Sequence, residues 1–530
     1  MRMKTENQRN SIKEITDNNE YARRKLFFKG FVLTNDARVD YVKFPFYGRW
    51  QRHALQNKFY IITHPDLNIT IIESSDGKTA VLIGHAYNPI SGLYCEGEIL
   101  KILLNKEDEN AFYDYVNELT GVFCLFVLDG NICKIINDPV GLQTVFYTAD
   151  REKFYVSSHS NLIGDLLRLE FSPYVTKLVK APTFHYFGNQ LPGNITQFSN
   201  VFRLNPNHVL ICEEKFIQKR FYHPKCLHVS EENIYDSLIK ILTDTMALIA
   251  KKWARPAISL TGGCDSKTTL ACAKSVWDKY AFFSYDSQEN ERPDMKAADA
   301  ICHALNLNLI KYHVPYSDDC FENLESIRAV LMWNGGNIRY NNANDVRKRV
   351  FLDNVNDFDV EVKSWASEVG RSRYTKHYNG RTNFGKTPNP RICTTFYKFL
   401  FFNRILINKT DKVFEEYLES YFEPDPNNPV PWQDQFYWEW HWPSRDGITL
   451  TCEQLFSNDI SVPYNNRKIL ELLLSMPEED RISDKVYYEI RQRLDPRIDN
   501  ACTNVTDVNH TALRAKLENL YYIFNRLLPY

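Results

Sequence analysis

The chain of 530 residues is too long for one hydrophobic core and suggests about two to four domains, at roughly 150 residues each. Its 64 basic and 66 acidic residues give a formal net charge of -2, which argues against nucleic acid as a main partner. The twelve cysteines contain no C-x-x-C pair, so their spacing indicates neither a zinc ribbon nor a redox motif.

The N-terminal segment 1–24 is polar and charged, without the apolar stretch of a signal peptide. No later segment has about 18 uninterrupted apolar residues, the length that a membrane-spanning helix needs. We therefore expect a cytoplasmic, soluble protein that does not bind a membrane.

Residues 25–222 have the pattern of short strands separated by turns, for example at 59–63, 70–73, 80–84 and 122–128. Nearly every residue of 122–128 is apolar, which is typical of a strand covered on both faces. Asp129-Gly130 or Gly130-Asn131 then turns the chain into a hairpin with residues 132–136. A β-rich domain is expected over residues 25–225.

The pattern changes after Tyr222, and a second domain is expected over residues 230–530. A helix is predicted over 231–253, where Ile234, Leu238, Ile241, Leu242, Met246 and Ile249 form one stripe. Strands at 257–260, 280–285 and 308–313 alternate with helices at 267–277 and 294–305, as in a parallel α/β sheet. From about residue 320 onward the signals are mostly helical, apart from the aromatic and proline-rich stretch 422–443.

A glycine-rich turn follows the first strand of this sheet and enters a helix. Backbone N–H groups and the positive end of the helix dipole can then meet an anion, and the glycines let it come close. Thr261 and Ser266 add hydroxyl donors, Lys267 adds a cation, and Asp265 is expected to hold Mg²⁺. The residues expected to bind ATP here are Ser259, Leu260, Thr261, Gly262, Gly263, Asp265, Ser266 and Lys267.

The same residues also suit a simpler role, a Gly-Gly turn capped by Asp or Ser at the start of a helix. The position of the turn favours a ligand site, because ligands bind at the carboxyl ends of parallel strands. The turn is neither a Walker A loop nor a dinucleotide-binding G-x-G-x-x-G. Stabilisation of a leaving pyrophosphate is the chemistry that it supports.

The turn resembles the phosphate loop of the N-type ATP pyrophosphatases, whose usual form is Ser-Gly-Gly-x-Asp-Ser-Ser. Thr261 stands for the first Ser of that motif and Lys267 for the last. The resemblance implies that the backbone of the next strand contacts adenine. Phe283, Ser284 and Tyr285 would provide those contacts.

The N-terminal half is similar to the class II amidotransferase domain of asparagine synthetases. The similar segments are 121–127, 137–147, 154–158, 200–210 and 220–222, and the resemblance spans roughly residues 80–500 in the same order. It implies an α/β and α+β multidomain fold. An Ntn-hydrolase-like β-sandwich with helices would precede a parallel-sheet α/β ATP pyrophosphatase domain of the adenine nucleotide alpha hydrolase type.

The chain departs from this family at the glutaminase nucleophile. Class II glutaminases use a cysteine that becomes N-terminal after removal of Met, with its own amine as the base. Here Arg2 follows Met1, and the first cysteine is Cys95 in Tyr-Cys-Glu-Gly. We expect that glutamine hydrolysis is lost and that the domain serves as a scaffold, as in β-lactam synthetases and lasso-peptide cyclases.

A second departure lies in the acidic loop of the synthetase half. The family's Ser-Gly-x-Gly-x-Asp-Glu is replaced by residues 364–374, in which Glu368 is the candidate base or metal ligand. Arg371 and Arg373 could stabilise a phosphate or a substrate carboxylate. A solvated helix start with ordinary ion pairs would have the same composition.

Three further features lie toward the C-terminus. Residues 459–467 resemble the family's R-x-P-F-L-D stretch, and Lys485 matches a common family lysine, either as a catalytic residue or as a structural helix lysine. The aromatic stretch 436–442 could line a substrate pocket or pack between helices. The histidines show no metal-binding spacing.

The resemblance implies an ATP-dependent, AMP-forming ligase with Mg²⁺·ATP as its cofactor. A small-molecule, peptide or sugar carboxylate attacks the α-phosphate, pyrophosphate leaves, and an amine or ammonia displaces AMP; a homodimer is possible. Glutamine-dependent asparagine synthesis remains open, although Arg2 opposes it. AMP-forming activation for sulfur transfer or nucleotide modification is also compatible with the loop, and so is a catalytically inactive scaffold or binding protein.

Overall fold

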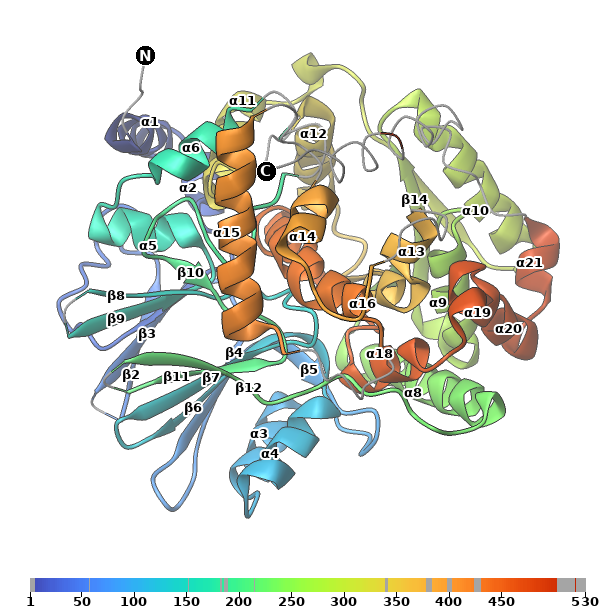
Figure 1. Ribbon diagram of the computed structural model, residues 1–530. Helices are drawn as coiled ribbons and strands as arrows, with labels where there is room; N and C mark the ends of the chain where they lie inside the picture. Colours follow the sequence, from blue (N-terminus) through green and yellow to red (C-terminus); the bar gives the residue numbers. More distant parts are fainter. Residues whose placement is uncertain are drawn as a thin grey trace.

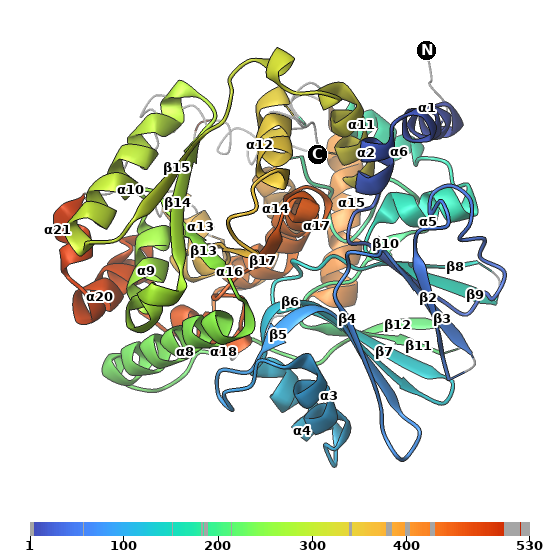
Figure 2. The same ribbon diagram turned by 180° about the vertical axis from the view of Figure 1, so that it is seen from behind.

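The computed structural model describes residues 5–56, 58–150, 152–181, 184, 189–213, 215–338, 342–377, 384–397, 403–423, 430–502 and 520. Within these ranges, no helix combines the length and the hydropathy that crossing a membrane requires. The chain forms a β-sandwich half and a parallel-sheet half that lie side by side (Figures 1 and 2).

Two six-stranded antiparallel sheets make up the sandwich. One sheet has the order β10-β8-β9-β1-β3-β2, with β1 (Phe31–Thr34), β2 (Gln51–Leu55), β3 (Phe59–Thr63), β8 (Phe146–Asp150), β9 (Lys153–Ser157) and β10 (Phe202–Arg203). The other has the order β12-β11-β7-β6-β5-β4, with β4 (Ile69–Glu73), β5 (Thr79–Tyr87), β6 (Thr120–Asp129), β7 (Ile132–Asn137), β11 (His208–Cys212) and β12 (Phe216–Arg220).

Strand β6 confirms the prediction of a strand covered on both faces. Cys124, Phe126 and Leu128 point into the core between the two sheets. Phe123 and Leu125 alternate with them and pack against the outer helices α3 (Glu96–Leu104) and α4 (Glu109–Asn117). The predicted hairpin is present as well, because Asp129 pairs with Ile132 across a two-residue turn.

Helices also cover the outer face of the other sheet. Val32 and Ile62 from that sheet share a core with the N-terminal helix α2 (Glu20–Lys25) and with α5 (Ser160–Leu167). The helix α1 (Thr5–Asn18) packs against α2. The sandwich therefore has four layers, with helices outside both sheets.

The second half contains a five-stranded parallel sheet in the order β15-β14-β13-β16-β17. Its strands are β13 (Pro256–Ser259), β14 (Ala281–Asp286), β15 (Leu309–His313), β16 (Val360–Val362) and β17 (Asp459–Ser461). The predicted helix at 231–253 is α8 (Glu231–Lys252), and the one at 294–305 is α10 (Arg292–Leu305). The two halves together confirm the expected α/β and α+β multidomain fold.

The structure differs from the prediction in two places. The helix predicted over 267–277 is α9 (Cys264–Cys272), which begins directly after Gly263 and is followed by the 3-10 helix η1 (Lys274–Lys279). Strands β16 and β17 lie in the region where we expected mostly helices. With three residues each, they are too short to show an alternating pattern.

A buried polar network joins the two halves. Arg220, at the end of β12, donates to both carboxylate oxygens of Glu439 at 2.6 and 2.7 Å. Asn207 donates to the same Glu439 at 2.9 Å and accepts from Arg467 Nε at 2.9 Å. Arg220 and Glu439 are 3% and 0% exposed, so this ion pair is an internal part of the fold.

The aromatic stretch 436–442 lies in the same interface, mostly within the π-helix η5 (Tyr437–Gly447). Phe436, Trp438, Trp440 and Trp442 are buried. Trp438 Nε1 donates to the carbonyl oxygen of Pro139 in the sandwich half at 2.7 Å. Of the two roles expected for this stretch, packing is therefore the one that the structure confirms.

Candidate functional site

The glycine-rich loop lies where the sequence predicted it, after the central strand β13 of the parallel sheet. Leu260 N–H donates to the carbonyl oxygen of Phe283 at 2.8 Å, which continues the pairing of β13 with β14. Gly263 is the N-cap of α9, and because glycine has no side chain it makes no capping hydrogen bond. Its first-turn N–H groups therefore remain available to an anion.

The hydroxyl groups of Thr261 and Ser266 fold the loop onto itself. Their oxygens lie 3.0 Å apart, and Ser266 Oγ also accepts from Thr261 N–H at 3.3 Å. Thr261 Oγ1 accepts from Gly263 N–H at 3.1 Å. These hydroxyls shape the loop in addition to any contact that they make with a ligand.

One loop donor is occupied by a residue that the sequence analysis did not identify. Asp294, in the first turn of α10, accepts from Gly262 N–H at 3.1 Å through Oδ1. Helix α10 follows strand β14, the neighbour of β13. An acidic residue at the start of the helix after the neighbouring strand was the available sequence signal.

Lys267 takes another direction than expected. Its side chain is 2% exposed, and Nζ lies 3.2 Å from both Asp499 Oδ1 and the carbonyl oxygen of Cys502. The position four residues into α9 directs it toward α21 (Arg497–Ala501). Its charge is thus neutralised by Asp499, so the expected contribution of Lys267 to anion binding has no support in this geometry.

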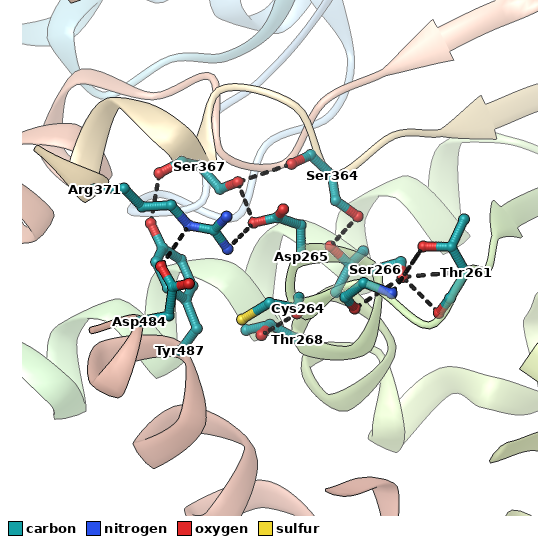
Figure 3. Close-up of polar contacts among 12 residues, drawn as sticks. Thr261, Cys264, Asp265, Ser266, Thr268, Ser364, Ser367, Arg371, Asp484 and Tyr487 are labelled. Carbon is teal, nitrogen blue, oxygen red and sulfur yellow. Dashed lines mark hydrogen bonds and ion pairs between the residues drawn. The ribbon is translucent and has the colours of Figure 1, made fainter. Parts of the chain in front are cut away.

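Asp265 connects the loop to the segment after β16 (Figure 3). Asp265 Oδ1 accepts from Ser367 Oγ and from Arg371 Nη2, both at 2.6 Å. Ser367 and Arg371 begin and end the 3-10 helix η4 (Ser367–Arg371). The fold thus brings together two expected site residues, Asp265 and Arg371, that lie 106 positions apart in the sequence.

Helix α20 (Lys485–Leu494) and the residue before it hold Arg371 from the other side. The guanidinium lies 4.6 Å from the centre of the Tyr487 ring, and Tyr487 OH donates to the carbonyl oxygen of Ser367. Arg371 Nε lies 3.3 Å from Asp484 Oδ1. Neither Asp484 nor Tyr487 could be identified from the sequence, because nothing in their local pattern marks them as partners of Arg371.

Close packing fixes the path of η4. A Cβ atom at Gly370 would lie 2.7 Å from Leu473 Cβ, so any larger residue would push the segment away from α18 (Arg467–Leu474). Ser364 Oγ, just before η4, accepts from Thr269 of α9 at 2.7 Å. The segment after β16 is therefore fixed against both α9 and α18.

Glu368 lies inside η4 and is half-buried. Among the residues that the structure describes, Oε2 of Glu368 has no hydrogen-bond partner. Burial, and then the charge of Asp265, raise the pKa of Glu368 to about 7, although Arg371 opposes this shift. A carboxyl group that titrates near neutral pH can accept or donate a proton during a reaction.

We expect Glu368→Gln to stabilise the protein at pH 8 by about 1–3 kcal/mol and to have little effect at pH 4. The pKa of Glu368 is raised from its ordinary value of 4.5 to about 7, so its neutral form is the one that suits the fold. Wild-type stability is then complete below about pH 4.5 and falls as the pH rises to 7, whereas Gln stays neutral.

Thermal unfolding from pH 4 to pH 8 measures this difference. Glu289→Gln is the control, because Glu289 is 81% exposed and this variant makes the same substitution at a side chain in contact with water. Equal stability of wild type and Glu368→Gln at pH 8 would contradict the expectation that the charged form of Glu368 destabilises the fold.

Magnesium at Asp265, which the family resemblance implies, does not fit this arrangement. Asp265 Oδ1 already accepts two hydrogen bonds, and a fixed guanidinium lies beside it. A second cation there would be repelled by that charge. In the part of the chain that the structure describes, no three His, Cys, Asp or Glu side chains gather as a metal site.

The expected adenine strand is β14, next to the loop. Phe283 and Ser284 are buried, and the Phe283 ring stacks on Phe358 with centroids 4.8 Å apart. Burial raises the pKa of Tyr285 to about 12, so its hydroxyl stays protonated. The side chains of Phe283 and Ser284 therefore belong to the core, whereas Tyr285 is half-buried, and the backbone is the part of this strand that suits the expected role.

A cavity of about 490 Å³ opens beside the first turn of α10. Its lining residues are Asp286, Arg292, Met295, Lys296, Asp299, Lys311, His313 and Tyr316. Asp286 is buried and accepts from His313 Nδ1 at 2.6 Å and from Tyr316 OH at 3.0 Å. This cavity could not be predicted from the sequence, because its residues come from β14, α10, β15 and the turn after β15.

Lys485 does not join the site. Its side chain is 50% exposed, and Nζ pairs with Asp480 Oδ2 at 2.8 Å. Tyr487, two residues later, is the residue of α20 that contacts Arg371. Of the two roles expected for Lys485, a structural helix lysine is the one that agrees with its position.

No family model matches the sequence, and no curated protein matches it. Solved structures are similar to it in part, among them the following three. One is an allosteric regulatory enzyme of purine biosynthesis, with 11% identity, coverage of 47% of this chain and 58% of that chain, and a TM-score of 0.25. Another is the glutamine phosphoribosylpyrophosphate amidotransferase of B. subtilis with ADP and GMP, with 9% identity, coverage of 69% of this chain and 74% of that chain, and a TM-score of 0.24. The third is the glutamine-dependent NAD+ synthetase of Acinetobacter baumannii with ADP, with 11% identity, coverage of 65% of this chain and 67% of that chain, and a TM-score of 0.20.

The chain thus spans less than two thirds of the first of these structures. At such identities and TM-scores, the function of this protein has to be argued from its own site.

Proposed function

We propose that the protein is an ATP-dependent, AMP-forming carbon–nitrogen ligase. The observation that carries this proposal is the meeting of two loops at Asp265. An uncapped helix start after the central strand faces a segment that supplies Arg371 and Glu368. Backbone N–H groups beside a fixed guanidinium can stabilise the negative charge that develops on a phosphate. A carboxyl group with a pKa near 7 can then transfer a proton.

The first-turn N–H groups of α9 would hold the phosphates that leave as pyrophosphate, with Thr261 and Ser266 keeping the loop in shape. The backbone of β14 would contact adenine. Arg371 would stabilise the negative charge that develops as the bond between the α- and β-phosphates breaks. Magnesium would enter with the nucleotide, bound to its phosphates.

The reaction has two steps. A carboxylate oxygen of the substrate attacks the α-phosphorus of ATP, and pyrophosphate departs with the electrons of the broken P–O bond. The nitrogen of an amine or ammonia then attacks the activated carbonyl carbon, and AMP leaves. Glu368 would take the proton that the nitrogen releases, for which a pKa of about 7 is well matched.

The proposal is tested by pyrophosphate release from ATP, scanned over candidate acids and amines. A productive pair should release pyrophosphate and AMP in equal amounts with the amide. Failure to bind ATP in calorimetry with Mg²⁺ would overturn the proposal. Binding without turnover for any acid would favour a binding protein.

We expect glutamine not to serve as the nitrogen donor. Cys124, Cys133 and Cys212 lie in the core of the sandwich, where burial raises the pKa of each thiol, so none forms a thiolate. Cys95 is exposed, but it lies within the chain as the N-cap of α3 and has no α-amine of its own.

Glutamate release from glutamine is the measurement for this expectation, with ammonium chloride as a second nitrogen source. Turnover of glutamine by the purified protein would contradict it and would restore glutamine-dependent asparagine synthesis as the better proposal.

A further inference from the structure

The side chain of Arg371 is held in place by contacts on several sides. Its side chain is 14% exposed and lies between the Asp265 carboxylate at 2.6 Å and the Asp484 carboxylate at 3.3 Å. The Tyr487 ring supports the guanidinium at 4.6 Å. Arg371 belongs to η4, and these contacts come from α9 and from α20 with its N-cap, so two other elements fix the position of the charge.

The carboxylate of Asp265 is likewise engaged in hydrogen bonds. Ser367 Oγ and Arg371 Nη2 share one carboxylate oxygen, each at 2.6 Å. A divalent ion at this carboxylate would have to approach a guanidinium that neither moves away nor loses its proton. Burial opposes the charge of Arg371, but Asp265 raises the pKa of the guanidinium well above its ordinary value.

A guanidinium can perform the electrostatic part of a metal ion's task. It is planar, stays charged, and presents several N–H donors that match two phosphate oxygens at once. A magnesium ion instead needs near-octahedral oxygen ligands and usually keeps several of its waters. The partner that the structure places beside Asp265 is a guanidinium, that of Arg371.

We infer that Arg371 occupies the place at Asp265 that a divalent cation would need, and that it contacts the ATP phosphates without a metal bridge to Asp265. This inference rests on the proposed function. It follows that nucleotide binding depends on Arg371 and requires no divalent ion, whereas removal of the guanidinium uncovers Asp265 for a metal.

Calorimetry of the full chain with α,β-methylene-ATP, whose α–β bridge cannot be cleaved, tests the inference. For the wild type, the dissociation constants in EDTA and in Mg²⁺ should agree within about threefold. Arg371→Ala should weaken binding in EDTA by about 10- to 100-fold, and Mg²⁺ should recover part of that loss. The affinity of Arg371→Lys in EDTA should lie between those of the wild type and Arg371→Ala, because lysine retains the charge but not the paired N–H donors of the guanidinium.

Lys376→Ala is the matched control. Lys376 Nζ pairs with Asp484 Oδ2 at 3.0 Å, so this variant also removes a positive charge from Asp484 while leaving Asp265 untouched. Its binding should equal that of the wild type in both buffers. Thermal unfolding of each variant shows whether a loss of binding comes from a loss of folding.

The outcomes separate the two proposals. Wild-type binding that occurs in Mg²⁺ but disappears in EDTA would overturn the inference and leave the ATP site intact. Absence of binding in both buffers would overturn the proposed function, and the inference with it. The wild-type comparison alone decides between these results, even if Arg371→Ala does not fold.

Discussion

Asp265→Ala is expected to lower pyrophosphate release from ATP by at least about 100-fold, because two charge-assisted hydrogen bonds of roughly 1.5–3 kcal/mol each are lost. Asp265 is the residue through which α9 contacts both ends of η4, at Ser367 and Arg371. Without the carboxylate, the guanidinium loses a fixed partner and no longer faces the phosphate loop in one orientation. Initial rates with the best acid and amine pair measure the effect.

Asp278→Ala provides the comparison for this variant. Asp278 lies in η1 of the same half, is 69% exposed and pairs with Lys279 at 2.9 Å. The substitution removes an equal charge without touching the loop, and its rate should stay within about twofold of the wild type. If Asp265→Ala retained the wild-type rate with an intact fold, the loop would not be the catalytic site.

Glu439→Ala is expected to lower the free energy of unfolding by about 3–5 kcal/mol, the usual effect of removing one partner from a buried ion pair. Arg220 would remain buried without its carboxylate, and Asn207 would lose an acceptor. Arg467 lies in the same network, where burial lowers its pKa to about 10 and the negative charge of Glu439 is among the groups that oppose this shift. Urea unfolding followed by fluorescence measures the change.

The exposed pair of Arg493 and Glu232 supplies the control. It has the same bidentate geometry, with both bonds at 2.7 Å, but Glu232 is 67% exposed. Glu232→Ala should leave the unfolding midpoint unchanged, because water replaces the lost contact. Equal effects of Glu232→Ala and Glu439→Ala would show that burial adds nothing to the interface pair.

Much of the fold could be predicted from local pattern. The apolar stripe of α8, the hairpin of β6 and β7, and the alternation of strands and helices from 257 to 313 all depend on residues close in sequence. Strands β16 and β17 could not be predicted, because each has only three residues and is defined by its pairing, β16 with β13 and β17 with β16. Their pairing is a tertiary property of three-residue segments.

For the site, the sequence identified the residues better than their partners. Asp265 and Arg371 could be named from motif positions, but the bond between them depends on how β13 and β16 lie side by side. The direction of Lys267 is set by Asp499, which no motif connects with the loop. Asp294 likewise reaches Gly262 from the helix of the neighbouring strand.

The buried network between the halves bears on how such a chain can change over time. Glu439 and Trp438 of the parallel-sheet half find Arg220 and Pro139 in the sandwich. Asn465 donates to the carbonyl oxygen of Gly121 at 2.6 Å. A sandwich without catalytic activity would still be under selection, because its deletion would expose Glu439 and Trp438 to solvent without their hydrogen-bond partners. Deleting that half of the gene would therefore destabilise the remaining half, whether or not the sandwich has a catalytic role.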